Sequence, residues 1–281
     1  MRAPVLLLAA LTACASPASQ SVPTTSAGCD DGYHYETGRR GGALVCETRT
    51  LSARGRALAV DATPNGSIAV ETWDGDGIRI EATVRAWAPT EDEARAVLRE
   101  TEVQQRPGLV RTRLPEATRG AWSRDRPWSS VSYTLQVPRD AELDLETVNG
   151  GVTVRGVHGK TEFEVVNGGV TLDRVGGEVT GRTTNGPVTL DLARGFGPVD
   201  VASTNGPIDV SVPEDASAEV DARTTMGPVR FDGLPLRDVG CTGRETRAVP
   251  CTSGRVVGTL GGGTAPLRLS TTNGPIALRR R

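Results

Sequence analysis

Apolar and polar residues alternate through the second half of the chain, and this alternation returns with a fixed period. A phrase in which Asn-Gly is followed by Gly or Pro and then by Val or Ile occurs four times within residues 143–212, with its asparagines 18, 18 and 20 residues apart. The phrase is centred on Asn149, Asn167, Asn185, Asn205 and Asn273, with a degenerate copy at Met226 and a faint one at Asn65. A fixed period near 20 residues is typical of stacked-repeat folds.

Each repeat contains two short alternating segments. In the first repeat Val152 and Val154 follow the asparagine with Thr153 between them, and Leu143 and Leu145 precede it with the same spacing. This alternation predicts a half-buried β-strand on each side of an Asn-Gly corner. We therefore predict an all-β fold, a single-stranded β-solenoid (β-helix-like) with coils of roughly 18–21 residues.

An antiparallel meander is the main alternative, because Asn-Gly between two apolar segments is a strong hairpin signal. The residue after the glycine closes a two-residue hairpin with its own N–H, and at several corners that residue is a proline, which has none. These prolines are Pro187, Pro207, Pro228 and Pro275. Stacked coils make no such demand, so the solenoid is favoured, and stacking places the five repeated asparagines in one structural ladder.

The N-terminal half is less regular. Residues 29–140 are predicted to form a cap and the first coils, with strands near residues 57–60, 68–71, 78–84, 109–114 and 131–137. Thr90-Glu91-Asp92-Glu93 is a capping box and predicts one short helix, which ends before Pro107. Residues 141–281 are predicted to form the repeats, interrupted by an insert at residues 237–253, after which coils are expected to resume at Val256–Leu260.

The first 13 residues resemble an export signal, in which Arg2 precedes an apolar segment too short to span a bilayer. Leu11-Thr12-Ala13-Cys14 resembles the bacterial lipobox, so we predict lipidation of Cys14; a plain secretory signal with an incidental cysteine is the alternative. Residues 14–28 lack charged and aromatic side chains and are predicted to be a flexible tether. Ala15, rather than an acidic residue, follows Cys14, which favours attachment of the exported protein to the outer membrane.

The remaining cysteines form two pairs that are local in sequence. Cys29 with Cys46 and Cys241 with Cys251 predict two disulfides in an oxidising compartment, the second of which staples the insert. Metal binding is the alternative. Neither pair has the two-residue spacing of a zinc site, and the chain contains two histidines, so no metal and no cofactor are predicted.

The order of these motifs is similar to that of a known family. A strand ending at Val137-Pro138, the repeated Asn-Gly-x-Val phrase and a closing Thr271-Thr272-Asn273-Gly274-Pro275-Ile276 resemble the bacterial putative-adhesin family of β-strand-repeat domains, from about Leu58 to the C-terminus. The resemblance implies an exported, often lipid-anchored β-solenoid and supplies no catalytic residues. The insert between Cys241 and Cys251 departs from the plain repeat.

No catalytic motif is recognisable in the sequence. Asp173, Asp191 and Asp232 share the outward position six residues after the corner, and together with a base in a pocket they would suit a polysaccharide lyase or hydrolase. A solvated column of carboxylates is the alternative interpretation. The segment at residues 74–77, Asp-Gly-Asp-Gly, resembles part of a calcium loop but lacks the later ligands, so it is interpreted as a turn.

Two tryptophans are the candidate ligand contacts. Trp122 and Trp128 flank a loop that would stack on a sugar ring or a peptide; packing of the cap onto the coils is the alternative. A net charge of −2 without a basic stripe argues against nucleic acid as a partner.

We therefore predict a non-catalytic cell-envelope lipoprotein that presents its solenoid surface for adhesion, ligand binding or scaffolding. Its expected partners are the membrane, through the lipid anchor, and a glycan or an envelope or surface protein. The alternatives are a carbohydrate-active enzyme on a β-helix and a periplasm-facing structural or stress-response lipoprotein.

Overall fold

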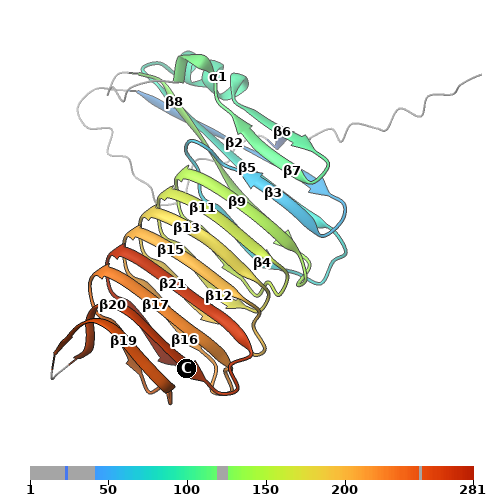
Figure 1. Ribbon diagram of the computed structural model, residues 1–281. Helices are drawn as coiled ribbons and strands as arrows, with labels where there is room; N and C mark the ends of the chain where they lie inside the picture. The colour runs from blue at the N-terminus through green and yellow to red at the C-terminus, as the bar shows by residue number, and fades with distance from the viewer. Residues whose placement is uncertain (1–22, 25–41, 119–125, 247–248) are drawn as a thin grey trace, which may run out of the picture.

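The computed structural model describes residues 23–24, 42–118, 126–246 and 249–281. The predicted signal peptide, Cys14, the tether, Cys29 and Trp122 lie outside the described residues, as does the side chain of Cys251. Two eleven-stranded sheets, here called sheet A and sheet B, make up the described part, together with the α-helix α1 (Glu91–Glu100) and a short 3-10 helix at Glu116–Thr118 (Figure 1). The fold is therefore all-β apart from these helices.

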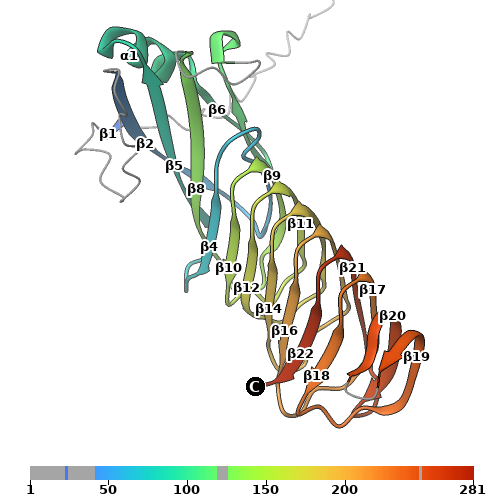
Figure 2. The ribbon, with the colours of Figure 1, turned by 90° about the vertical axis from the view of Figure 1, so that its left-hand side faces the viewer.

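Sheet A runs in the order β1 (Pro23–Thr24), β2 (Ala43–Ala53), β5 (Ile78–Ala88), β8 (Trp128–Val137), β4 (Ile68–Thr72), β10 (Val152–Arg155), β12 (Val170–Val175), β14 (Val188–Leu192), β16 (Ile208–Val212), β22 (Ile276–Arg280) and β18 (Val229–Asp232). Sheet B runs in the order β19 (Arg237–Thr246), β20 (Val249–Leu260), β17 (Ala218–Met226), β21 (Ala265–Asn273), β15 (Val199–Asn205), β13 (Val179–Asn185), β11 (Thr161–Asn167), β9 (Glu142–Asn149), β3 (Ala57–Asp61), β7 (Leu109–Arg113) and β6 (Glu102–Arg106). Figure 2 shows the strands of sheet A from β4 to β18 as successive rungs.

The repeats stack as parallel coils, as the sequence predicts. Each repeat contributes one strand to sheet B and the next strand to sheet A, and equivalent residues pair in register, for example Asn167 with Asn185 and Val170 with Val188. The prolines after the corner glycines accept hydrogen bonds through their carbonyl oxygens, as when Val188 N donates to Pro207 O at 2.9 Å. A parallel ladder needs no N–H from these prolines, so the antiparallel meander is excluded for the repeats.

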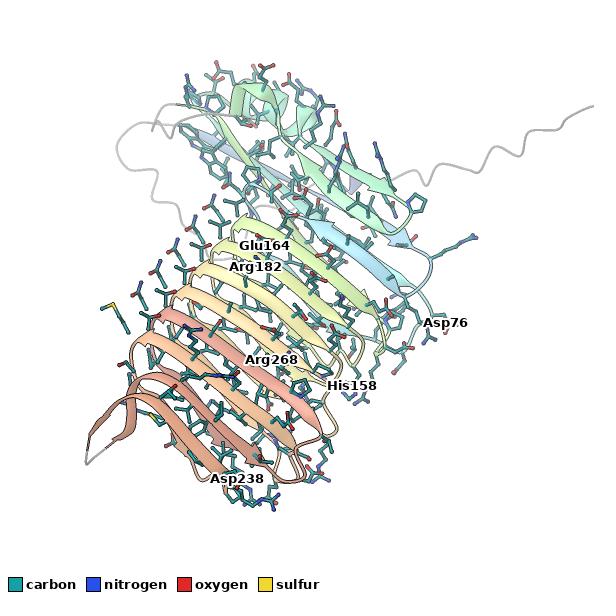
Figure 3. All side chains as sticks on the ribbon, viewed as in Figure 1. Asp76, His158, Glu164, Arg182, Asp238 and Arg268 are labelled. Carbon is teal, nitrogen blue, oxygen red and sulfur yellow. The ribbon has the colours of Figure 1, made fainter. Side chains whose placement is uncertain are left out.

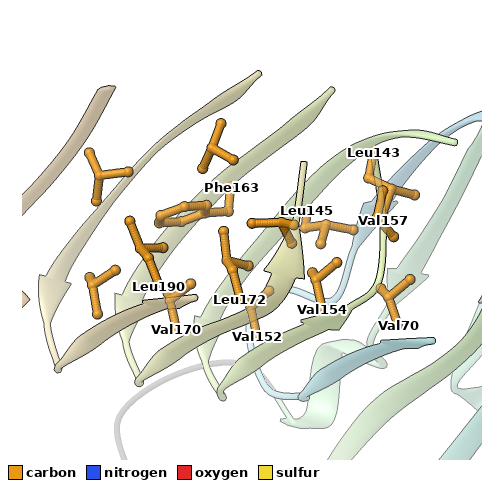
Figure 4. Close-up of a cluster of buried hydrophobic side chains, with 14 of the residues drawn as sticks. Val70, Leu143, Leu145, Val152, Val154, Val157, Phe163, Val170, Leu172 and Leu190 are labelled. Carbon is orange, nitrogen blue, oxygen red and sulfur yellow. The ribbon is translucent and has the colours of Figure 1, made fainter. Parts of the chain in front are cut away.

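A continuous apolar core lies between the two sheets. Side chains from β9, β10, β11, β12 and β14 meet there (Figure 4), and Leu145, Leu172 and Leu190 are each 0% exposed. Phe163 fills the space left by Gly181 in the next coil, where an added Cβ would lie 2.5 Å from the Phe163 ring. Because the Phe163 ring occupies the space beside Gly181, these neighbouring coils pack into each other and depend on each other for stability.

The Asn-Gly corners form a hydrogen-bonded ladder along one edge of the solenoid. Each corner asparagine from Asn149 onward donates from Nδ2 to the Oδ1 atom of the asparagine in the neighbouring coil, at 2.7–3.0 Å, and Asn65 only accepts. The ladder contains Asn65, Asn149, Asn167, Asn185, Asn205 and Asn273. The ladder that the sequence predicts is thus present, and it extends to Asn65. It ends at Met226, which pairs with Asn273 in the last coil.

The corner glycines are required by the close approach of neighbouring coils. A Cβ on Gly168 would lie 2.0 Å from the carbonyl oxygen of Gly150, and a Cβ on Gly186 would meet Gly168 in the same way. Buried hydroxyl groups satisfy several of these carbonyls, as when Thr147 Oγ1 donates to Gly66 O at 2.7 Å. The recurring Asn-Gly phrase is therefore explained by backbone contact through glycine and amide contact through asparagine.

The order of the coils differs from their order in sequence at the C-terminal end. The coil formed by β21 and β22 lies between the β15–β16 coil and the β17–β18 coil, with β21 parallel to both β15 and β17. The prediction that coils resume at Val256–Leu260 is wrong, because these residues belong to β20, which pairs antiparallel with β17. The insert is a hairpin of β19 and β20 that extends sheet B.

The N-terminal end carries additional strands and the helix. β3 and β4 form a coil beside β9 and β10, after which β5 pairs antiparallel with β2 and β8. The helix begins at the predicted capping box, in which the Thr90 hydroxyl accepts from Glu93 N at 3.3 Å. Within the described ranges, no helix has the length and apolar character needed to cross a bilayer.

The predicted disulfides involve cysteines inside and outside the described residues. Cys46 lies in β2 and Cys241 in β19, but Cys29 and the side chain of Cys251 are outside the described residues. The pairings Cys29–Cys46 and Cys241–Cys251 therefore stay predictions.

Candidate functional site

The outer face of sheet B carries a polar groove that crosses six strands. It has a volume of about 840 Å³ and runs over β9, β11, β13, β15, β21 and β17; we call it the sheet B groove. Its floor is formed by short hydroxyl side chains, including Thr180, Thr184, Thr204, Ser270, Thr272 and Thr225. These side chains point outward because residues of the opposite phase on the same strands fill the core.

One end of the groove is acidic. Glu146 on β9 pairs with Glu164 on β11, and Asp144 pairs with Glu162 on the same two strands. Asp61 on β3 continues the row, because it pairs with Glu146. Like charges in directly paired positions of adjacent strands repel each other. The structure therefore holds five carboxylates on three neighbouring strands.

This repulsion changes the titration of two of the carboxyl groups. Desolvation, followed by the charges of neighbouring carboxylates, raises the pKa of Asp144 above its ordinary value. Desolvation and the charges of Asp61, Glu164 and Asp144 raise the pKa of Glu146 in the same direction. Lys160 offsets part of the charge, since its Nζ lies 3.1 Å from a carboxylate oxygen of Glu162. Groups that are destabilised in their charged form favour a cationic neighbour.

The sign of the charge changes along the groove. Arg182 on β13 follows Glu164 in the same row, and Arg223 on β17 lies beyond Ala202 and Ser270 (Figure 3 shows Glu164 and Arg182 on adjacent strands). The middle of the groove carries Arg182 on β13 and Asp200 on β15 among hydroxyl side chains. The arrangement gives the groove one acidic end and one basic end.

The C-terminal part of sheet B contains a well-defined ion pair. Arg255 on β20 forms a fork with Asp221 on β17, with Nε–Oδ1 and Nη2–Oδ2 distances of 2.8 and 2.7 Å. The hydrogen bond from Arg255 lowers the pKa of Asp221. Arg268 pairs in register with both Asp200 and Asp221. A smaller pocket of about 350 Å³ lies over these residues.

The three aspartates of the carbohydrate-active alternative, Asp173, Asp191 and Asp232, do not gather at one site. A β-bulge shifts the register between Asp173 and Asp191. Asp191 accepts from Arg281 at 2.7 Å, and Ser211 and Arg279 stand between Asp191 and Asp232. Among the described residues no three His, Cys, Asp or Glu side chains gather in a way that could hold a metal ion.

Trp128 and the segment at residues 74–77 lie among N-terminal strands and take part in packing and turn contacts there. Trp128 on β8 pairs with Trp87 on β5, so it belongs to the N-terminal strands and lies away from the sheet B groove. The segment at residues 74–77 is a turn, in which Trp73 Nε1 donates to Gly77 O at 2.8 Å. Arg79 lies 3.9 Å from the centre of the Trp73 ring and covers the same turn.

The charged rows of the sheet B groove were missed in the sequence, although a signal for them exists. They occupy the positions three and five residues before each corner asparagine, as Glu146 and Asp144 do before Asn149. In the four successive repeats the residues three and five before the asparagine are Glu146 and Asp144, Glu164 and Glu162, Arg182 and Thr180, and Ala202 and Asp200. Since equivalent positions stack, this pattern specifies the acidic end and the change of sign.

Comparison with known proteins identifies a family. The family model described as Toastrack DUF4097 matches residues 129–279, which cover the repeats and the strand before them. No curated protein sequence matches the chain.

Three solved structures are similar in fold. A putative cell adhesion protein from Clostridium sporogenes has 12% identity and a TM-score of 0.47, and the match covers 85% of this chain and 100% of that chain. A putative adhesin from Bacteroides fragilis has 11% identity and a TM-score of 0.35, with 85% and 97% covered. A putative lipid binding protein from Parabacteroides distasonis has 11% identity and a TM-score of 0.33, with 84% and 96% covered.

Proposed function

Because this chain belongs to the Toastrack DUF4097 family, to which no activity is assigned, we propose a function from the geometry of its surface. We propose that the protein is a non-catalytic cell-envelope lipoprotein whose sheet B groove binds a partner in adhesion or scaffolding. The observation that carries this proposal is the groove itself, which combines a hydroxyl-lined floor with an acidic end.

The chemistry of the groove favours a protein segment as the partner. The groove crosses six strands, which corresponds to roughly 24 Å at the usual spacing between strands, the length of about seven extended residues. Its one aromatic lining residue, Phe163, is 1% exposed, so no ring is available to stack on a sugar. A segment with basic residues at one end would relieve the repulsion between Glu146 and Glu164.

A binding screen with matched variants tests this proposal. The labelled full-length chain is applied to immobilised surface proteins, basic peptides and glycans at low and high salt. The double variant Glu146→Gln/Glu164→Gln removes the central charges of the acidic end, and Glu100→Gln on α1 is the control. We expect binding to basic protein segments that the double variant weakens about tenfold and that salt weakens further.

Two results would contradict the proposed partner class. Equal binding of the double variant and the wild type would exclude the acidic end, and binding confined to glycans would exclude a protein segment. Release of reducing sugars from any glycan in the same screen would contradict the non-catalytic part of the proposal and favour the carbohydrate-active alternative.

Export and lipid attachment are part of the proposal. The lipobox-like segment ending at Cys14 supports an anchor in the outer membrane, with residues 15–28 as a tether. Cys14→Ser should move the protein from the membrane fraction to the soluble fraction, and unchanged fractionation would contradict the anchor. Protease treatment of intact and lysed cells with a C-terminally tagged chain then separates a surface-exposed solenoid from a periplasm-facing one.

Two disulfides complete the proposal. The local spacing of Cys29 with Cys46 and of Cys241 with Cys251 supports their pairing in an oxidising compartment. Peptide mapping of the unreduced protein should recover these two cross-links. Recovery of free thiols at these positions from exported protein would contradict the pairing.

A further inference from the structure

A second groove lies at the other corner of the coils, where the strands of sheet A end. It has a volume of about 600 Å³ and is formed by consecutive corners after β8, β10, β12 and β14, together with the C-terminus after β22. We call it the arginine groove, after its basic lining residues Arg139, Arg155, His158, Arg174, Arg194 and Arg281. His158 lies at the margin of the coils, apart from Glu164 and Arg182 (Figure 3).

The arginine groove has an excess of positive charge. Five guanidinium groups line it, and Glu71 is the one carboxylate among the lining residues. Glu71 accepts from Arg155 at 2.8 Å, and three carboxylates outside the lining also pair with groove arginines: Asp191 with Arg281 at 2.7 Å, Asp173 with Arg174 at 3.5 Å and Asp215 with Arg194 at 3.8 Å. Each ion pair is a single contact between side chains that solvent reaches. Such pairs are weak, so they leave the guanidinium groups able to bind a further anion.

Arg139 has no carboxylate partner among the described residues. Its Nη2 atom lies 3.1 Å from Nε2 of His158, and the His158 backbone N–H donates to Arg139 O at 2.6 Å. Burial and the charge of Arg139 lower the pKa of His158, so the neutral imidazole accepts the hydrogen bond from the guanidinium. The imidazole packs against Gly176, where a Cβ would lie 2.9 Å from the ring. His158 therefore holds Arg139 at the mouth of the groove while the charge of Arg139 remains unneutralised.

Arg174 adopts an unfavourable backbone conformation at this site. Its φ is +52°, in the left-handed region that non-glycine residues seldom occupy, and it lies within the β-bulge of β12. A glycine at this position would avoid the strain. The bulge instead places an arginine on the groove, with its Nη2 atom 3.5 Å from Asp173. Strain of this kind at a cluster of like charges is typical of functional sites.

We propose that the arginine groove binds a ligand bearing two or more phosphoryl groups. Guanidinium groups match phosphate oxygens through forked hydrogen bonds, and the corners repeat at about 4.8 Å along the solenoid, so two neighbouring arginines reach adjacent phosphates. The ligand is either a soluble polyphosphate compound or the phosphorylated headgroup of an envelope lipid. This site is separate from the sheet B groove and does not depend on the function proposed for it.

Calorimetry and NMR with pyrophosphate test the proposal on the full-length chain. The chain has only two histidines, His34 and His158, so the imidazole resonances can be assigned with a His34→Gln variant. We expect saturable binding of pyrophosphate, a shift of the His158 resonance and a rise in the His158 pKa on binding. Arg139→Gln should weaken binding about tenfold or more, because a charge-assisted hydrogen bond is lost. Arg95→Gln on α1 is the matched control and should leave binding unchanged.

Arg174→Gly separates a functional arginine from a structural one. Glycine relieves the left-handed conformation, so this variant should raise Tm by about 2–4 °C while weakening pyrophosphate binding. Non-saturable binding, or equal affinity of Arg139→Gln and the wild type, would overturn the proposal. Vesicles that contain cardiolipin, which carries two phosphodiester groups, and vesicles of neutral phosphatidylcholine distinguish the two sources. Binding to the cardiolipin vesicles that pyrophosphate competes away indicates a headgroup, and its absence alongside pyrophosphate binding indicates a soluble compound.

Discussion

The end of the asparagine ladder offers a direct test of what the ladder contributes to stability. Met226 occupies the corner position of the last coil, and its carbonyl oxygen accepts from Gly274 N at 2.9 Å, as a corner asparagine's does. Its side chain is 66% exposed and contributes little burial. Met226→Asn would therefore extend the ladder by one residue, with its Nδ2 donating to the Oδ1 atom of Asn273.

The expected gain follows from the bond that is added. One intramolecular hydrogen bond contributes roughly 0.5–1.5 kcal/mol. In a chain of this size about 1 kcal/mol corresponds to a rise in Tm of roughly 2–4 °C. Little apolar burial is lost, because the methionine side chain is mostly in solvent. We expect Met226→Asn to be more stable than the wild type by this amount in thermal and urea unfolding.

Two further variants at the same position isolate the amide. Met226→Ala removes the methionine without adding a donor, and Met226→Asp adds a side chain of the same shape that has no N–H for Asn273. The expected order of Tm is Asn above Ala, with Asp at or below Ala. If Met226→Asn and Met226→Ala melt at the same temperature, the side-chain ladder does not stabilise the solenoid.

Three other variants test the packing, the strand order and the charges. Gly168→Ala should lower stability by roughly 1–3 kcal/mol in urea unfolding, because its Cβ would lie 2.0 Å from Gly150 O. Gly151→Ala, with a nearest contact of 3.3 Å, should lower stability less. Ending the chain at Gly263 removes β21 and β22, which lie between two other coils. Circular dichroism and limited proteolysis should then show loss of structure from β15 to β20. A stable core that still includes β17 and β18 would contradict the strand order. Glu146→Gln should raise Tm at pH 7, because the folded state raises the pKa of Glu146 and is destabilised when this carboxyl group is charged. Below the ordinary pKa of 4.5 the group is protonated in both the folded and the unfolded state, and the destabilisation develops as pH rises through the raised pKa. The difference in Tm between variant and wild type should therefore disappear toward pH 4.

The sequence specified the coil and its register. Equivalent residues stack, so the spacing of Asn149, Asn167 and Asn185 predicts which residues pair, and the prolines exclude hairpins at the corners. The position of the helix followed from the Thr90 capping box, which depends only on neighbouring residues. These features are local or strictly periodic, which is why they can be read from one chain.

The candidate sites were less accessible to sequence reasoning, for two different reasons. The rows of Glu146 and Glu164 are periodic and were readable once the outward positions were compared between repeats. The arginine groove follows no period, since Arg139, His158 and Arg174 occupy different positions in corners of different sequence. The bulge at Arg174 has no sequence signature, because bulges are favoured at glycine and the chain has arginine there.

The order of the last coils has a physical reason that lies in the ladder itself. If the coils stacked in sequence order, Met226 would stand between Asn205 and Asn273, and the ladder would end at Asn205. With the C-terminal coil inserted, Asn273 donates to Asn205 at 2.7 Å and Met226 is left at the end, where it interrupts nothing. The insertion also lets the β19–β20 hairpin extend sheet B beyond β17, so the chain's least regular segment caps the solenoid. A corner without asparagine therefore marks the coil that belongs at the end of the stack, whatever its place in the sequence.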